Sequence, residues 1–245
     1  LNLITPQKVR EGVAEVREGR SFSLSLPLTF PGGNVLNPAR HPPQLSPSRR
    51  PDGKAVYLHE FGPDHNTTDV ACDDRVTLHL QYSTQWDALA HIGSRFDADG
   101  DGEAEIVFYN GWRAEHLVHE ADDSARADRL GIESMAAHGV QGRAVMIDLR
   151  RHLGDARTKV DHATLMRVMA ADGVTVEPGD MVCLHTGFAD VVLSMGGQPD
   201  STRLAAACAV LDGADPALRR WIDESGLAVL IADNYAVEDR PYDFH

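Results

Sequence analysis

Four polar side chains that can bind a metal or move a proton lie within residues 81–91. Gln81, Gln85, Asp87 and His91 stand at offsets of 0, 4, 6 and 10 along the chain. Such spacing lets a short stretch of backbone direct two amides, a carboxylate and an imidazole to one point, where an oxygen ligand binds a cation and an imidazole takes up a proton. The simpler interpretation is a solvated Asp–His pair on a helix face or a helix cap. Spacing alone leaves both interpretations open.

The residues before this stretch predict the element that positions it. Val76, Leu78 and Leu80 alternate with polar neighbours over residues 76–81. A period of two predicts a half-buried strand. We therefore expect the polar groups to follow the end of a strand, where a rigid scaffold presents functional side chains.

Residues 81–91 also resemble the signature of the cyclase family of hydrolases, which includes bacterial kynurenine formamidase and isatin hydrolase and whose motif reads H-x-G-T-H-x-D-x-P-x-H. The matching positions are Thr84, Asp87 and His91. The departures from the motif are Gln81, Ser83, Gln85 and Leu89. Gln81 and Gln85 stand where the family has its first two histidines, which bind a divalent metal together with the aspartate.

The resemblance implies a fold, a cofactor and a reaction. The fold is α/β, the swivelling β/β/α fold with a mixed sheet flanked by helices, in a homodimer or homotetramer. Asp87 would be a metal ligand, with Gln81 and Gln85 in the other two ligand positions. A divalent metal, manganese or zinc, would activate water, and His91 would be the general base. The expected reaction is hydrolysis of a C–N bond in a small formamide, cyclic amide or imide.

The two glutamines keep other functions open. A glutamine offers a neutral amide oxygen instead of an imidazole nitrogen, which favours manganese or magnesium over zinc. One alternative is a metal-free member of the fold that binds a small molecule without hydrolysing it. Another is a metal-independent dehydratase or isomerase in which Asp87 and His91 perform acid–base chemistry alone.

The resemblance extends over most of residues 1–238. Residues 142–149 resemble the family's central strand, residues 177–188 its "pGD-x-v-l-x-x-TGw" segment, and residues 228–238 a later strand and loop. Side chains at the ends of these strands, with aromatic residues nearby, are candidates for binding a small-molecule substrate. They are Trp86, Tyr109, His185, Thr186, Asp233 and Glu238.

Composition narrows the class of protein. The chain has 23 basic and 37 acidic residues and a net charge of −14, which argues against binding nucleic acid. It has neither a secretory signal pattern nor an apolar run of the length that crosses a membrane, so we expect a cytoplasmic protein. The three cysteines lie far apart, which indicates neither a zinc ribbon nor a disulfide framework. Cys183 and Cys208 lie in apolar segments and are expected in the core.

The periodicity of apolar residues, together with helix-capping and turn-forming residues, predicts one α/β domain over residues 1–245. Helices are expected over residues 5–19, 131–138, 161–173, 201–211 and 215–222, and strands over 21–28, 76–81, 144–149, 181–185 and 227–232. Residues 31–53 are rich in proline and glycine, which predicts an irregular loop or arm that covers a pocket or a partner subunit. Residues 97–102 predict an acidic turn, with a weak cation site as the alternative. Both chain ends suggest an incomplete polypeptide.

Overall fold

The computed structural model describes residues 1–62, 65–121 and 124–239. Within these residues the chain forms two compact units. The first unit contains Leu1–Ser23, Trp86–Gly187 and Cys208–Asp239, and the second contains Leu24–Gln85 and Phe188–Ala207.

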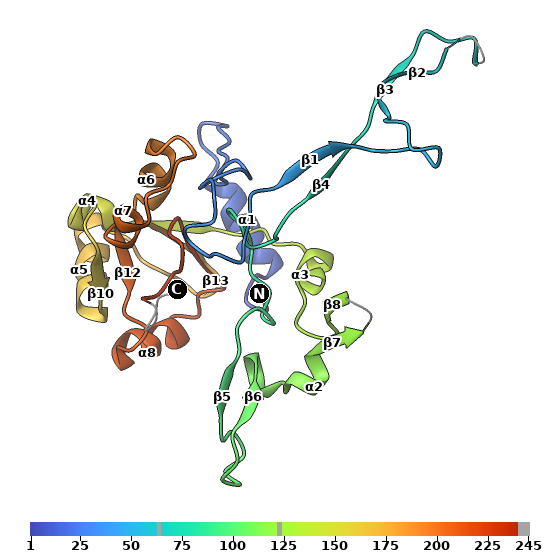
Figure 1. The fold of residues 1–245 in the computed structure, drawn as a ribbon. Coiled ribbons are helices and arrows are strands. Elements are labelled where there is room, and N and C mark those ends of the chain that lie inside the picture. Colours follow the sequence, from blue (N-terminus) through green and yellow to red (C-terminus); the bar gives the residue numbers. More distant parts are fainter. Residues whose placement is uncertain (63–64, 122–123, 240–245) are drawn as a thin grey trace. The chain divides into compact units, whose positions relative to one another are not determined.

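The first unit is built on parallel strands. β9 (Ala144–Asp148), β11 (Met181–His185) and β13 (Val229–Ala232) form a sheet in the order β13-β11-β9, and β10 (Thr158–Val160) pairs in parallel with β12 (Ala209–Leu211). Figure 1 shows β10 and β12 close to α4 (Leu149–Leu153) and α5 (His162–Asp172). The expected strands over 144–149, 181–185 and 227–232 are confirmed.

Helices α5 and α8 (Pro216–Glu224) cover the core of this unit. Asp161 accepts a hydrogen bond from the backbone N–H of Thr164 and begins α5, and Gly173 ends it in the left-handed conformation, as an N-cap and a C-cap require. The buried core consists of Ile147, Leu149, Val160, Leu165, Val168, Met169, Val182, Leu184, Ala209, Leu211 and Leu218. Among the residues that the structure describes, every helix is too short or too polar to span a bilayer.

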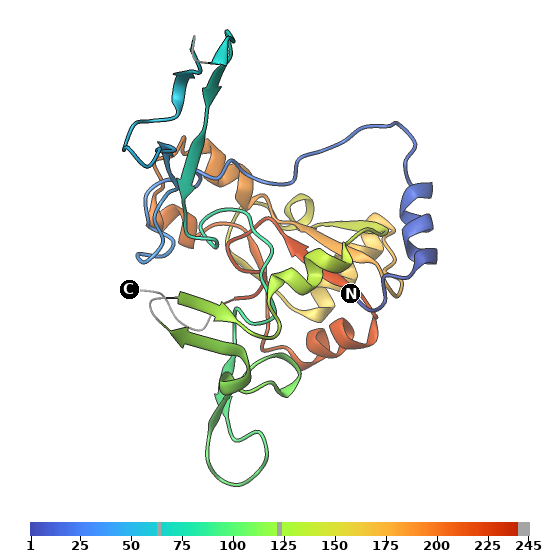
Figure 2. The ribbon, with the colours of Figure 1, turned by 90° about the vertical axis from the view of Figure 1, so that its right-hand side faces the viewer.

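Short elements complete the first unit. They are α1 (Pro6–Ala14), β5 (Ser94–Phe96), β6 (Glu105–Val107), a 3-10 turn η2 (Tyr109–Gly111), α2 (Ala114–Leu117), β7 (Val118–Ala121), β8 (Ser124–Ala127) and α3 (Ile132–His138). β5 pairs with β6 and β7 with β8, both antiparallel, and Figure 2 shows the β7–β8 ribbon in green. The unit therefore joins a parallel sheet to antiparallel ribbons.

Helix α1 buries a charge instead of an apolar stripe. The Thr5 hydroxyl caps its start, but the helix expected to reach residue 19 ends at Ala14, and Val13 is exposed. Lys8 is the buried residue, and its Nζ lies 3.2 Å from a carboxylate oxygen of the fully buried Asp180. Burial lowers the pKa of Lys8, but hydrogen bonds to Glu11 and Asp180 outweigh it and raise the pKa above its usual value.

The second unit contains antiparallel ribbons and two short helices. β1 (Gln44–Pro47) pairs with β4 (Asp74–Thr77), and β2 (Tyr57–Glu60) pairs with β3 (Val70–Cys72). Figure 1 shows the two ribbons in succession. α6 (Phe188–Ser194) and α7 (Ser201–Ala205) contact each other.

Two expectations about the N-terminal third are wrong. Residues 21–28 alternate but form no strand: no described strand pairs with them, Pro27 offers no N–H, and the N–H of Leu26 binds the Thr84 hydroxyl oxygen. Residues 31–53 are not wholly irregular, because β1 lies within them. Pro47 is tolerated there because it ends a strand at the edge of a two-stranded ribbon.

Two further boundaries also differ from prediction. The strand expected over 76–81 is β4, which ends at Thr77, so the polar stretch does not follow it directly. The helix expected over 201–211 stops at Ala205. Cys208 has a φ of 63°, which is incompatible with helix, and Leu211 and its neighbours pair with β10 instead.

Candidate active site

Asp87 and His91 lie together in an irregular segment of the first unit. Nε2 of His91 is 3.9 Å from Oδ1 of Asp87, and the aspartate is half-exposed whereas the histidine is largely buried. The segment has no helical conformation, so the pair is not the helix-face pair of the simpler interpretation. The N–H of His91 donates to the carbonyl of Ala88, and that of Ala90 to the carbonyl of Leu130. These bonds hold the turn that brings the two side chains together.

Gln81 and Gln85 belong to the second unit, whereas Asp87 and His91 belong to the first. A shared site of the four therefore stays a prediction. The backbone carbonyl of Gln81 accepts a hydrogen bond from the guanidinium of Arg40 at 2.9 Å.

The residues between the two glutamines bind the N-terminal part of the second unit. The buried Tyr82 donates its hydroxyl hydrogen to the carbonyl of Gly33 at 2.7 Å, and the Ser83 hydroxyl donates to the carbonyl of Pro27. Thr84, which matches the family motif, accepts from the N–H of Leu26. This part of the motif thus has a local structural role.

The three predicted ligands carry only oxygen donors. Asp87 offers carboxylate oxygens and the two glutamines offer amide oxygens, which suit manganese or magnesium. Of the described residues, no group of three His, Cys, Asp or Glu side chains that includes Asp87 is close enough to hold an ion.

A separate acidic cluster is formed by Asp97, Asp99 and Glu105, whose ligand atoms lie within 4.8 Å of one another. Arg113 pairs with Asp99 and with Glu105, and the hydrogen bond from Arg113 lowers the pKa of Asp99. Asp97 accepts hydrogen bonds from three backbone N–H groups of the following turn. The expected acidic turn is thus present, and its carboxylates bind an arginine and the backbone.

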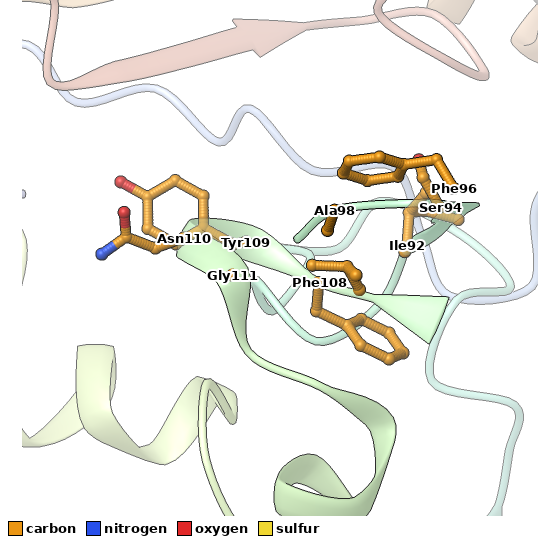
Figure 3. A pocket seen from close by; sticks show the side chains of 10 residues that line it. Ile92, Ser94, Phe96, Ala98, Phe108, Tyr109, Asn110 and Gly111 are labelled. Carbon is orange, nitrogen blue, oxygen red and sulfur yellow. The ribbon is translucent and has the colours of Figure 1, made fainter. Parts of the chain in front are cut away.

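An open hollow of about 440 Å³ begins one residue after His91. Figure 3 shows Phe96 and Phe108 toward one end of it and Tyr109 and Asn110 at the other. Tyr109 therefore lines a cavity next in sequence to the His91 turn, whereas Trp86 is exposed and does not line it. A role of either aromatic residue in substrate binding stays a prediction.

A second group of polar side chains lies at the carboxyl ends of β9, β11 and β13. His185 is directly opposite Asp148 in the parallel register, and its Nδ1 is 2.9 Å from Oδ1 of Asp148. Burial raises the pKa of Asp148, but the hydrogen bonds from the N–H of Arg151 and from His185 outweigh it and lower the pKa below its usual value. This edge is where ligands bind in open parallel sheets.

Asp233 fixes the backbone next to this pair. One of its oxygens accepts from the N–H of Thr186 at 2.6 Å and from the Thr186 hydroxyl at 2.7 Å, and the other accepts from the N–H of Gly187 at 2.9 Å. Thr186 is fully buried. The structure therefore gives both residues a structural contact at the sheet edge.

Glu238 lies elsewhere in the first unit. It is exposed, and its backbone pairs in parallel with Leu211, the last residue of β12. Asp148 is the residue at the sheet edge that the sequence analysis did not single out. The sequence did contain a signal for Asp148: it is a polar residue near the end of a predicted buried strand, just as Asp233 directly follows another predicted strand.

Comparison with known proteins agrees with this fold. A crystal structure described as that of a novel cyclase is 26% identical and has a TM-score of 0.72, over 97% of this chain and 71% of that chain. No curated protein matches the sequence. The family model described as "Putative cyclase" matches residues 22–239. The chain therefore belongs to the cyclase family.

Proposed function

We propose that this protein hydrolyses a C–N bond in a small formamide, cyclic amide or imide. The observation that carries the proposal is the contact between Asp87 and His91, at 3.9 Å, within the residues that match the cyclase family model. The hollow lined by Tyr109 begins at the next residue, Ile92, and offers aromatic surface to a flat substrate.

His91 would move the proton. Its imidazole is largely buried and faces a carboxylate, so it can take a proton from an attacking water while Asp87 balances the charge that forms. The water oxygen bonds to the carbonyl carbon, the C–N bond breaks, and His91 returns the proton to the leaving nitrogen. The residue is regenerated, and the products are a carboxylic acid and an amine or amide.

A divalent cation would be held by Asp87 with the amide oxygens of Gln81 and Gln85. When bound, it would polarise the scissile carbonyl and lower the pKa of water. We infer manganese or magnesium from the all-oxygen donor set.

A second candidate function is metal-independent acid–base chemistry, as in a dehydratase or isomerase. It is favoured by the contact between Asp87 and His91, which forms without a cation. The same Asp87–His91 pair would then transfer protons without a cation.

Metal content and turnover distinguish the two functions. Protein purified without an affinity-tag metal is analysed by inductively coupled plasma mass spectrometry and assayed on aryl formamides, cyclic imides and lactams, with and without chelator. The hydrolase predicts near-stoichiometric metal and activity that are both lost in Asp87→Ala and retained in the control Asp99→Asn, which removes a carboxylate of the acidic turn. Chelator-resistant turnover would favour the second function. Metal retained in Asp87→Ala but lost in Asp99→Asn would overturn the assigned ligand.

A further inference from the structure

We propose that His185 is a second proton-transfer residue of this protein and that Asp148 is the positioning residue that orients it. The two lie at the carboxyl ends of β11 and β9. The role of His185 in turnover rests on the proposed hydrolase function. The orientation of His185 by Asp148 does not depend on that function.

The geometry leaves one ring nitrogen of His185 available. Nδ1 donates to Oδ1 of Asp148 at 2.9 Å. A neutral imidazole that donates at one nitrogen carries its lone pair at the other. Within its own unit, no described residue hydrogen-bonds to Nε2 of His185, so this atom can exchange a proton with a bound molecule.

Both members of the pair are held in place by other contacts. Oδ1 of Asp148 also accepts from the N–H of Arg151 at 3.1 Å, which caps the short helix α4. On the other side, Asp233 binds the N–H and hydroxyl of Thr186, the residue after His185. The imidazole is therefore fixed by its partner and by the backbone that carries it, as a site built on rigid elements requires.

A second His–Asp pair in the same unit allows a comparison of how far each pair is exposed to solvent. Nε2 of His152 lies 2.8 Å from Oδ1 of Asp172, with only 19% and 13% of the two side chains exposed. The side chains of His185 and Asp148 are 38% and 36% exposed. The bond lengths are similar, but the pair at the sheet edge is reachable by a ligand and the other is largely enclosed.

The charges around His185 come from several elements. Asp148 ends β9, Asp233 follows β13, and Arg150 and Arg151 belong to α4. Arg150 packs against Gly187 and pairs with Asp155 at 2.7 Å. The carboxylate in direct contact with the imidazole is Asp148.

The proton step is balanced without a further reactant. As the C–N bond breaks, Nε2 of His185 takes the remaining proton of the attacking water from the hydroxyl of the tetrahedral adduct and releases it to solvent, while His91 delivers the first proton to the leaving nitrogen.

The test compares three variants. Asp148→Asn keeps the helix cap, because asparagine is a good N-cap, but removes the charge that selects the Nδ1–H tautomer. His185→Gln removes proton transfer and keeps a polar side chain. His152→Gln is the matched control for losing a histidine from a His–Asp pair.

The first readout is the tautomer of His185, measured by long-range proton–nitrogen NMR and assigned from the spectrum of His185→Gln. The Nδ1–H form is expected in the wild type, and a mixture in Asp148→Asn. An Nε2–H form in the wild type, or an unchanged tautomer in Asp148→Asn, would overturn the proposal whatever the activity.

The second readout is the pH profile of kcat on the panel of amides and imides. His185→Gln is expected to lower kcat by about 100-fold or more with little change in KM and to remove one limb of the profile. His152→Gln should stay within about twofold of the wild type. An unchanged pH profile in His185→Gln would refute the role of His185 in turnover. A wild-type protein without turnover would refute the proposed hydrolase, and the NMR measurement of the His185 tautomer would then still test whether Asp148 orients His185.

Discussion

Replacing Asp233 by asparagine tests how strongly the sheet edge is fixed. The carboxylate accepts three hydrogen bonds, two from Thr186 and one from the N–H of Gly187. Asparagine keeps one acceptor oxygen, so its amide N–H₂ must face the N–H of Gly187. One bond to a charged acceptor is lost, at about 1.5–3 kcal/mol, and the other two become neutral bonds of about half the strength. We expect the free energy of unfolding to fall by about 3–5 kcal/mol.

Urea unfolding followed by tryptophan fluorescence measures this change. Trp86, Trp112 and Trp221 all lie in the same unit as Asp233, and Trp221 packs against its core. The signal therefore reports the unit that is perturbed.

Two further variants sharpen the result. Thr186→Val removes only the hydroxyl bond and should cost about 1.5–3 kcal/mol, and its effect should not add fully to that of Asp233→Asn because the two residues touch. Asp223→Asn changes an exposed carboxylate of α8 and should stay within about 0.5 kcal/mol of the wild type. An Asp233→Asn protein as stable as the Asp223→Asn control would refute this account of the edge.

Other features make further predictions. Lys8→Met should lower the free energy of unfolding by about 3 kcal/mol, because it leaves the fully buried Asp180 without its ammonium partner; a change below about 1 kcal/mol would contradict this. Burial raises the pKa of the Cys208 thiol to about 11, so in native protein Ellman's reagent at pH 7–8 should label the exposed Cys72 and leave Cys208 unreacted until denaturant is added. The pKa of Asp148 is lowered by folding, so its contribution to stability is present above the unfolded carboxyl pKa of about 4 and is lost as the pH falls through the folded value; Asp148→Asn should lose less stability than the wild type over that acid range. We also propose a homodimer or homotetramer, which sedimentation velocity should show as two or four times the mass of one chain.

The sequence predicted the central sheet well because each strand is marked by local signals. Residues 144–149, 181–185 and 227–232 are apolar runs with polar residues or turns at their ends, and they form β9, β11 and β13. β12 was missed because the alanine-rich residues before it favour helix. Its short segment becomes a strand only through its partner β10, more than 40 residues earlier in the chain, a non-local contact that no local pattern reveals.

The candidate site was predicted in part for a similar reason. The close spacing of Asp87 and His91 made their contact predictable, and a bend in an irregular segment provides it. Asp148 and His185 are far apart in the sequence, and only the register of β9 and β11 places them opposite each other. Residues 21–28 were wrongly predicted as a strand. Their alternation is typical of a strand, but a strand also needs a neighbouring strand to pair with, and alternation alone does not reveal whether one is present.

The division of the chain into units has a consequence for biosynthesis. The backbone passes from one unit to the other after Ser23, Gln85, Gly187 and Ala207, so each unit is assembled from separated pieces of the chain. β13 can join the parallel sheet only after the ribosome has synthesised residue 232, whereas the synthesis of β9 is complete at residue 148. During translation the edge of β11 that pairs with β13 thus stays unpaired while some 50 further residues are added, about 2–10 s at ordinary elongation rates. Chaperone dependence should follow from this topology, and simple truncation at any one crossing cannot yield either unit intact.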